Sequence, residues 1–255
     1  MTDVLSRIAA LRASHDRLRT VAAPLTPEQV RGPGYPSEWS IAQVLSHLGS
    51  GAEINGLILD SGVEQTPAPE PEAFRAIWAV WDAKDPDAQA ADALDSDARL
   101  VENVEALTAE QRENAVFPLW FGPADLATFV AMRLSEHAVH TWDVEVMLDP
   151  SATVLPEAVG TVLEYAKGLV GFAGKPGPAG RIHVTVTDPD AEYALVLGEK
   201  VALEPWDGGE RTGELALPAE AFLRLLYGRL DPAHSPSVTA TDVDLDALRA
   251  TFPGF

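Results

Sequence analysis

The sequence predicts an α+β protein, with an N-terminal four-helix bundle over residues 1–152 and a smaller α/β domain with an antiparallel sheet over residues 153–255. The prediction depends on a change of period. Apolar residues recur at helical spacing through the first half of the chain, whereas beyond residue 180 they alternate with a period of two. A hydrophobic fraction of 46% is sufficient for well-packed cores.

The first two long helices have clear signals. Apolar side chains return every three or four positions between residues 4 and 18, which is typical of one face of an amphipathic helix. The second helix is predicted to begin at Ser40, a good N-cap, with Gln43 as its capping-box partner. Trp39 precedes the cap and is placed to pack on Val44 as a hydrophobic staple.

Two further helical stretches complete the predicted bundle. One covers residues 71–107 and should break at Asp85-Pro86, because a residue before proline disfavours helical geometry. The other runs from about Pro123 to Leu148, after an aromatic loop over residues 117–123. Four long helices joined by loops favour an antiparallel bundle.

The second domain is expected to mix helices with strands. A helix is predicted over residues 156–173, and another from about Pro218 to Tyr227 should end at Gly228, because glycine is favoured just after a helix. The remaining elements are strands over 182–186, 195–197, 201–203 and 237–240, predicted mostly from alternating apolar residues, and a short closing helix over 245–250.

Composition and charge exclude several classes of function. The chain carries 18 basic and 39 acidic residues, a net charge of -21, which argues against nucleic acid and anionic membranes as partners. It has no long apolar run and no signal-peptide pattern at its N-terminus, so a cytoplasmic location is expected. It has no cysteine, so any sulfur chemistry would need a thiol from another molecule. The oligomeric state is not predicted by the sequence.

Three side chains on two predicted helices have the chemistry of a metal site. Glu136 and His140 are four residues apart, so both lie on one helix face with Cβ atoms about 5–6 Å apart. His47 lies about two turns into another helix. Two imidazoles and a carboxylate can bind a divalent metal and leave a coordination position open, which is typical of catalytic sites. Zinc suits this set, as do nickel, manganese and ferrous iron.

Each of these residues also has a simpler interpretation. His47 follows an apolar run and could be a hydrogen-bonded core histidine, and Glu136 and His140 could be an ordinary solvated pair. Arg133 lies three residues before Glu136, so the two could form a purely structural salt bridge. His15 and His137 compete with the other histidines as ligands. Asp143, three residues past the second ligand histidine, is either a carboxylate that orients the imidazole or an ordinary solvated acid. The residues alone leave these alternatives open.

Segments in both halves of the chain resemble the mycothiol-dependent maleylpyruvate isomerase family. In the first half they are WSIAQVLSHL at 39–48 and RLSEHAVHTWDVEVM at 133–147. In the second half, AFLRLLYGRLDP at 221–232 is similar to that family's Gly-Arg signature. The resemblance implies a DinB-like four-helix bundle followed by a domain similar to sterol carrier proteins.

The same resemblance implies a chemistry and a set of residue roles. His47, Glu136 and His140 would bind zinc or another divalent metal, and mycothiol would be the thiol cofactor. Its thiolate would add to a small electrophilic substrate, in an S-transferase or a cis-trans isomerase. Arg229 matches the arginine that acts on the substrate, and it would hold a carboxylate or stabilise enolate charge.

Two residues are expected to contact the cofactor. Asp143 matches the family's trailing acid, and Trp120 lies in the aromatic loop, where it is a candidate pocket wall. Two other functions remain in view: a metal-binding DinB-like protein without turnover, and a carrier that binds an apolar ligand in its second domain. The spacing of His47, Glu136 and His140 favours the metal-binding functions over the carrier.

Overall fold

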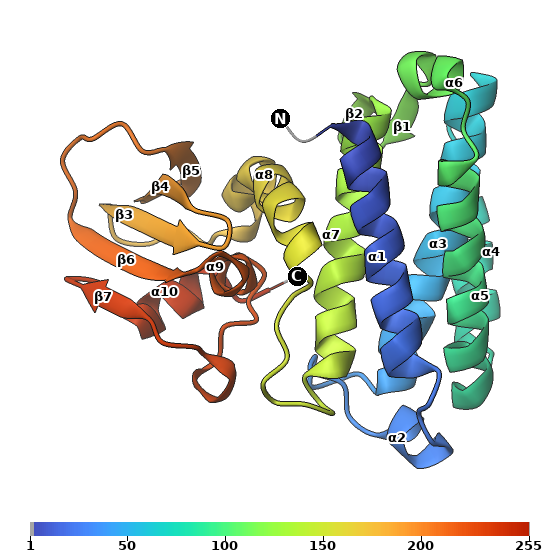
Figure 1. The fold of residues 1–255 in the computed structure, drawn as a ribbon, viewed down its shortest axis with the longest axis horizontal. Helices are drawn as coiled ribbons and strands as arrows, with labels where there is room; N and C mark the ends of the chain where they lie inside the picture. The colour runs from blue at the N-terminus through green and yellow to red at the C-terminus, as the bar shows by residue number, and fades with distance from the viewer. Residues whose placement is uncertain (1–2, 255) are drawn as a thin grey trace. The chain divides into compact units, whose positions relative to one another are not determined.

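A computed structural model describes residues 3–254 and shows the predicted α+β class (Figure 1). The chain divides into two compact units, Met1–Ala152 and Thr153–Phe255. The first is helical apart from a small hairpin, and the second combines a mixed sheet with helices. None of the helices formed by residues 3–254 has the length and hydropathy that crossing a bilayer requires.

The first unit is built on long helices that pack side by side (Figure 1). They are α1 (Val4–Ala22), α3 (Ile41–Glu64), α5 (Pro86–Glu105) and α7 (Leu126–Glu145). Helix α3 contacts both α5 and α7, and α1 contacts the same two helices from the other side. The predicted bundle is therefore present, with its core lined by apolar residues of all four helices.

Shorter helices connect the long ones. They are α2 (Pro27–Arg31), α4 (Pro71–Asp82) and α6 (Ala109–Asn114). Helix α4 packs on α3 through Trp81, because an added Cβ at Gly49 would lie 2.2 Å from the Trp81 ring. Helix α4 runs back along α3 towards the N-terminal end of α3. Helix α5 begins at that end, so α5 runs parallel to α3. The antiparallel arrangement predicted for the bundle holds for α3 and α7 but not for α3 and α5.

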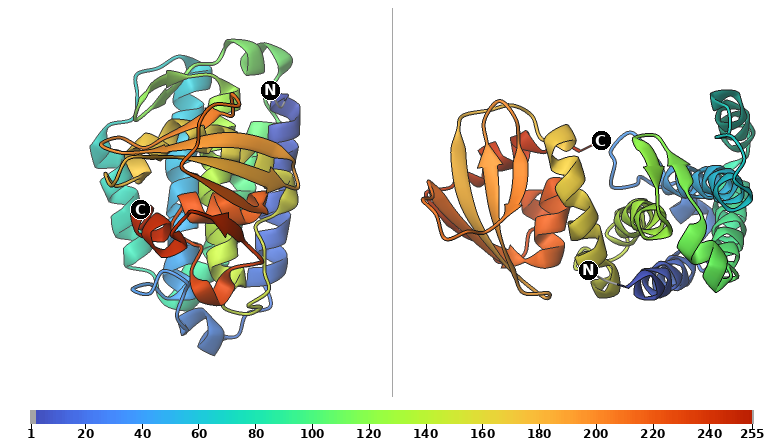
Figure 2. Two further views of the ribbon diagram at one scale, coloured as in Figure 1. Left: turned by 90° about the vertical axis from the view of Figure 1, so that its left-hand side faces the viewer. Right: turned by 90° about the horizontal axis from the view of Figure 1, so that it is seen from above.

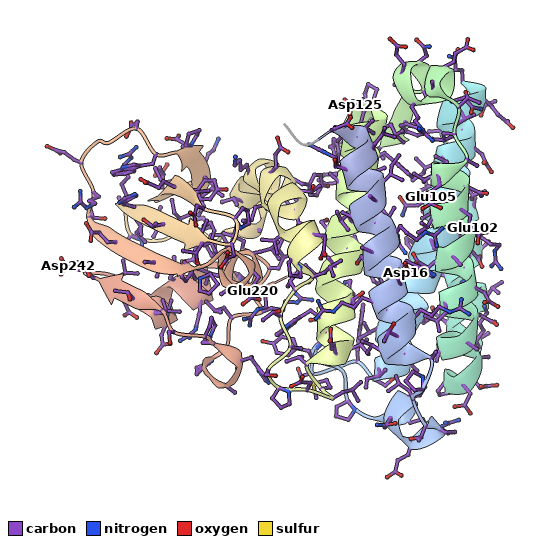
Figure 3. The ribbon with its side chains drawn as sticks, in the orientation of Figure 1. Asp16, Glu102, Glu105, Asp125, Glu220 and Asp242 are labelled. Atoms are coloured by element: carbon purple, nitrogen blue, oxygen red, sulfur yellow. The ribbon has the colours of Figure 1, made fainter. Side chains whose placement is uncertain are left out.

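Side-chain hydrogen bonds at the N-caps fix where α3 and α7 begin. Ser40 accepts a hydrogen bond from the Gln43 backbone N–H at 3.2 Å, and the Gln43 side chain accepts from the Ser40 N–H at 2.8 Å, so the predicted capping box is confirmed. Asp125, labelled at the head of α7 in Figure 3, accepts from the Thr128 N–H at 2.8 Å. These caps set the register of α3 and α7, the two helices that carry the predicted ligands.

The aromatic loop predicted over residues 117–123 is instead an antiparallel hairpin of β1 (Phe117–Leu119) and β2 (Gly122–Ala124). Phe117 is fully buried and stacks on Phe129 of α7 with ring centroids 4.8 Å apart. Gly122 adopts a φ of 126°, which suits glycine at the turn. Pro118 and Pro123 lie inside these short strands, and proline in a run argues against a strand, so the sequence favoured a loop.

The second unit has a five-stranded sheet in its described residues, in the order β5-β4-β3-β6-β7. The strands are β3 (Gly180–Thr187), β4 (Ala191–Leu197), β5 (Ala202–Pro205), β6 (Gly213–Pro218) and β7 (Thr239–Thr241). Strands β3 and β6 pair in parallel, so the sheet is mixed and the predicted antiparallel sheet is corrected at this pair. Strand β6 was not predicted, although Leu215 and Leu217 alternate before Pro218 as Leu195 and Leu197 do in β4.

Helices cover one face of this sheet (Figure 2). They are α8 (Pro156–Ala173) and α9 (Ala219–Leu226), and a short 3-10 turn (Pro232–His234) and α10 (Leu245–Thr251) complete the unit. Helix α9 ends next to Gly228, as predicted, with a φ of 72°. A Cβ at Gly228 would lie 2.3 Å from the Gly254 nitrogen, so glycine is needed for the close approach of the C-terminal segment.

Candidate metal centre

Helices α3 and α7 bring the three predicted ligands together. Nε2 of His47 on α3 lies 3.2 Å from Oε2 of Glu136 on α7. Nε2 of His140, one turn further along α7, lies 3.7 Å from the same oxygen. The three ligand atoms lie within 4.8 Å of one another. The 3.2 and 3.7 Å separations suit ligands that share one ion with bonds of about 2.0–2.2 Å.

A buried carboxylate fixes the orientation of His140. Nδ1 of His140 donates to Oδ2 of Asp143 at 2.8 Å, and Asp143 is fully buried. Because a carboxylate only accepts, the ring proton lies on Nδ1, and Nε2 presents its lone pair on the side of Glu136. Metal-binding histidines commonly have such a partner. The structure therefore contradicts the solvated-acid interpretation of Asp143 and places this residue behind the ligand, where it contacts His140.

The third ligand is an anion at neutral pH. Burial by itself would raise the pKa of Glu136, but the hydrogen bond from His47 and the nearby charges of His140, His47 and Arg133 outweigh it and lower the pKa to about 2. The side chain remains 47% exposed, and His47 is 39% exposed. The carboxylate is thus ready to bind a cation and is accessible from solvent.

An aromatic ring covers the two imidazoles. The Trp39 ring centroid lies 5.4 Å from that of His47 and 6.3 Å from that of His140, and the Trp39 and His140 rings are stacked. The staple predicted from the sequence concerned only the packing of Trp39 on Val44, so this contact was missed. Eight residues separate Trp39 from His47, and a ring just before the cap can extend along the first two turns. That spacing is the sequence signal from which the contact between Trp39 and His47 could have been predicted.

A second, fully buried group contains residue types that bind metals: His15, Asp97 and His137. Nδ1 of His15 and Nε2 of His137 lie 2.7 and 2.8 Å from the same oxygen, Oδ2 of Asp97. Nη2 of Arg133 donates to the other carboxylate oxygen at 2.8 Å. Burial by itself would raise the pKa of Asp97, but the charge and hydrogen bond of His137, the hydrogen bond of His15 and the charge of Arg133 hold it well below its usual value.

The two groups fit a metal differently. In the buried group, both imidazoles bind one carboxylate oxygen directly, so an ion would have to break these hydrogen bonds and lie beside the buried Arg133 guanidinium. In the group on α3 and α7, Arg133 does not pair with Glu136 among the described residues, so the structural salt bridge considered for Glu136 is not formed. The two imidazoles of the buried group are already hydrogen-bonded to Asp97, so the α3–α7 group has the better donor set for an ion.

Comparison with known proteins agrees with this architecture. The family model described as the mycothiol maleylpyruvate isomerase N-terminal domain matches residues 11–145, a little more than half of the chain. This chain belongs to that family. The matched range contains both histidine groups. No curated protein matches the sequence in a similar search.

Two solved structures of family members share the fold over nearly the whole chain. A crystal structure of a mycothiol-dependent maleylpyruvate isomerase has a TM-score of 0.68 at 14% sequence identity and covers 94% of this chain and 93% of its own. A histidine-to-alanine mutant of a mycothiol-dependent maleylpyruvate isomerase gives the same TM-score and coverage at 13% identity. At these identities the likeness establishes the fold, which includes the second unit, and leaves the activity open.

Trp120, predicted to contact the cofactor, is not brought to the candidate ligands. It lies in the turn of the β1–β2 hairpin and is 67% exposed. The hairpin base packs near the end of α3, where an added Cβ at Gly62 would lie 2.5 Å from the Phe117 ring. Gly62 follows His47 by fifteen residues, or about 22 Å of helix. Trp39 instead contacts the ligand histidines of this chain.

Arg229 lies in the second unit, just after α9. It is nearly buried, and its Nη1 donates to the Tyr227 carbonyl oxygen at 2.6 Å, which ties the guanidinium to the turn around Gly228. The helix-end position predicted from the Gly-Arg segment is therefore correct. The role of Arg229 towards a substrate stays a prediction.

The contact behind His140 supports a prediction. Replacing Asp143 with asparagine should lower the affinity for zinc about 10- to 100-fold, because the orienting charge on the imidazole is lost while its position is largely kept. A competition titration against a chromophoric chelator measures this change. Glu145→Gln on the same helix removes a partly exposed acid that pairs with Arg17, and should leave the affinity unchanged. Equal affinities in the two variants would contradict the orienting role.

Proposed function

We propose that this chain is a metal-dependent enzyme of the mycothiol-dependent type, acting as an S-transferase or a cis-trans isomerase on a small electrophilic substrate. The proposal depends on one observation: two imidazoles and an ionised carboxylate converge from α3 and α7 with the Nε2 atom of His140 oriented by a buried acid. Zinc is the proposed metal, and nickel, manganese or ferrous iron would also suit the donors.

The chain's own residues account for much of what such a centre needs. When bound, a divalent cation with an open position lowers the pKa of a coordinated thiol, which makes a thiolate available at neutral pH. His47, Glu136 and His140 would hold that cation, and the negative charge of Glu136 would reduce its net charge. The exposed fractions of His47 and Glu136 leave one side open to a small molecule. The chain has no cysteine, so the thiol must come from another molecule.

Trp39 would act beside this centre, and Arg229 of the second unit would act on the substrate. Trp39 stacks on His140 and limits water and rotation on one side of the ligands. Arg229 is proposed to hold a carboxylate or developing enolate charge of the substrate, for which a planar fork of donors is suited. The role of Arg229 follows the family resemblance, and the role of Trp39 follows its ring contacts with His47 and His140.

Elemental analysis followed by a thiol titration tests the proposal. We expect about one divalent ion per purified chain, and after exchange for Co²⁺ we expect mycothiol to produce a saturable sulfur-to-cobalt charge-transfer band. Serine-for-cysteine mycothiol, which lacks the thiol, is the control and should produce no band. A metal-free protein would contradict the metal centre. Metal without any thiol-dependent band would instead favour the binding protein without turnover.

A further inference from the structure

One turn along α3 and α7 from the ligands, a glycine faces the buried guanidinium of Arg133. Gly51 follows His47 by four residues, and Arg133 precedes Glu136 by three, so both lie on the helix faces that carry the metal ligands, about 5–6 Å away. Gly51 is partly exposed, whereas Arg133 is only 2% exposed. An added Cβ at Gly51 would meet a single neighbouring group within 4 Å, Nη1 of Arg133 at 3.1 Å. The absent side chain therefore leaves a notch with the guanidinium as its floor.

The guanidinium in this notch is only partly used by the protein. Nη2 donates to the Leu48 carbonyl at 2.9 Å and to Asp97 at 2.8 Å. Nη1 makes no hydrogen bond to residues 3–254 and is not among the fully buried side-chain atoms, so it can donate to a ligand, whereas Nε is buried without a partner. A guanidinium with a donor left over is suited to bind an acceptor that carries negative charge.

A second unsatisfied group lies on the next turn of the same helix. Asn55 follows Gly51 by four residues, and its Nδ2 donates to the Gly51 carbonyl at 2.7 Å. Its Oδ1 is buried and has no partner among the described residues. The stripe His47, Gly51, Asn55 thus runs from the metal ligands to the notch and a polar group beyond it. The stripe on α3 therefore carries one polar atom without a partner, and Arg133 of α7 faces the stripe at Gly51.

We propose that Gly51 and Arg133 form a subsite that holds a carboxylate group of the substrate beside the metal ligands. The inference rests on the proposed function, because it assigns the substrate of that centre to the carboxylate-bearing electrophiles. A planar carboxylate matches the guanidinium, and Gly51 lets it approach Nη1. With a dication bound, the charge of the ion exceeds that of Glu136, so the centre also attracts an anion. The net charge of -21 acts weakly beyond a Debye length of about 8–10 Å.

The test fills the notch at Gly51 by substitution and leaves the Arg133 guanidinium unchanged. Gly51→Ala adds one methyl group next to Nη1, whereas Gly56→Ala adds one on the same helix where nothing lies within 4 Å. Both exchanges favour the helix equally. Substituting Arg133 itself would break its buried ion pair with Asp97, so failure to fold would confuse the result. The probes are propionate and its uncharged analogue propionamide, titrated by calorimetry into the zinc-loaded proteins.

We expect propionate to bind the parent protein and Gly56→Ala alike, and to bind Gly51→Ala about tenfold or more weakly, since a hydrogen bond to a charged group is lost. Propionamide should bind none of them measurably. Equal propionate affinities in the two variants, or no binding to the parent, would overturn the subsite, because the anion would then contact only the ion or nothing. Zinc content is measured in every sample. If zinc is absent, the proposed metal centre fails, and the same contrast in the metal-free proteins still decides the subsite.

Discussion

Replacing His47 with alanine should abolish stoichiometric metal binding while the bundle stays folded. The substitution removes one of three ligands, and losing even a group behind a ligand costs about 10- to 100-fold in affinity, so at least a 100-fold loss is expected. His47 is 39% exposed and its carboxylate partner is 47% exposed. Water can therefore solvate Glu136 in the variant, and the free energy of unfolding of the metal-free protein should change by no more than about 0.5 kcal/mol.

A matched control separates the loss of a ligand from the loss of a histidine. His183 in the second unit pairs with Glu192 at 2.9 Å, much as His47 pairs with Glu136. His183→Ala should retain the metal. Elemental analysis after dialysis measures both variants, and chemical denaturation of the metal-free forms measures stability. Full metal content in His47→Ala would refute the centre on α3 and α7 and would transfer the metal to the buried group around Asp97.

Local signals explain why the ligands could be predicted. The capping box of Ser40 and Gln43 fixes where α3 begins, and so fixes the depth of His47 in the bundle. The spacing of Glu136 and His140 is a property of any helix. Only the antiparallel packing of α3 on α7 was needed to bring the two signals together, and a helical bundle supplies such a pair in most arrangements.

Contacts between segments far apart in the chain could not be predicted from the sequence pattern. Asp97 binds residues 36, 40 and 82 positions away, on α7 and α1, and nothing in its neighbourhood distinguishes it from the exposed acids of α5. The parallel pairing of β3 with β6 likewise depends on which edge of β3 is free after β4 has paired. Trp39 was assigned to local packing because its contact with His140 crosses to another helix.

The buried network around Asp97 should carry much of the stability of the bundle. Asp97→Asn keeps the side-chain volume but removes the charge that faces the Arg133 guanidinium, and it places an amide among donors from Arg133, His15 and His137. Breaking a buried ion pair by removing one partner typically costs about 3–5 kcal/mol. Asp92→Asn on the same helix is the control, since Asp92 is 52% exposed and pairs with Lys84, so the change should cost about 0–1 kcal/mol.

The pH dependence of this effect has a definite sign. The folded protein holds the pKa of Asp97 well below its usual value, so the unfolded chain takes up the proton first as pH falls. The stabilisation by Asp97 is therefore complete above the unfolded pKa of about 3.9 and is lost below it, as pH falls through the folded value. Denaturant unfolding of the metal-free proteins at pH 7 and pH 3 should show a smaller gap between parent and Asp97→Asn at pH 3 than at pH 7. A gap that stays small at pH 7 would mean that Arg133 is compensated by other groups, and the network would lose its role in holding α1, α5 and α7 together.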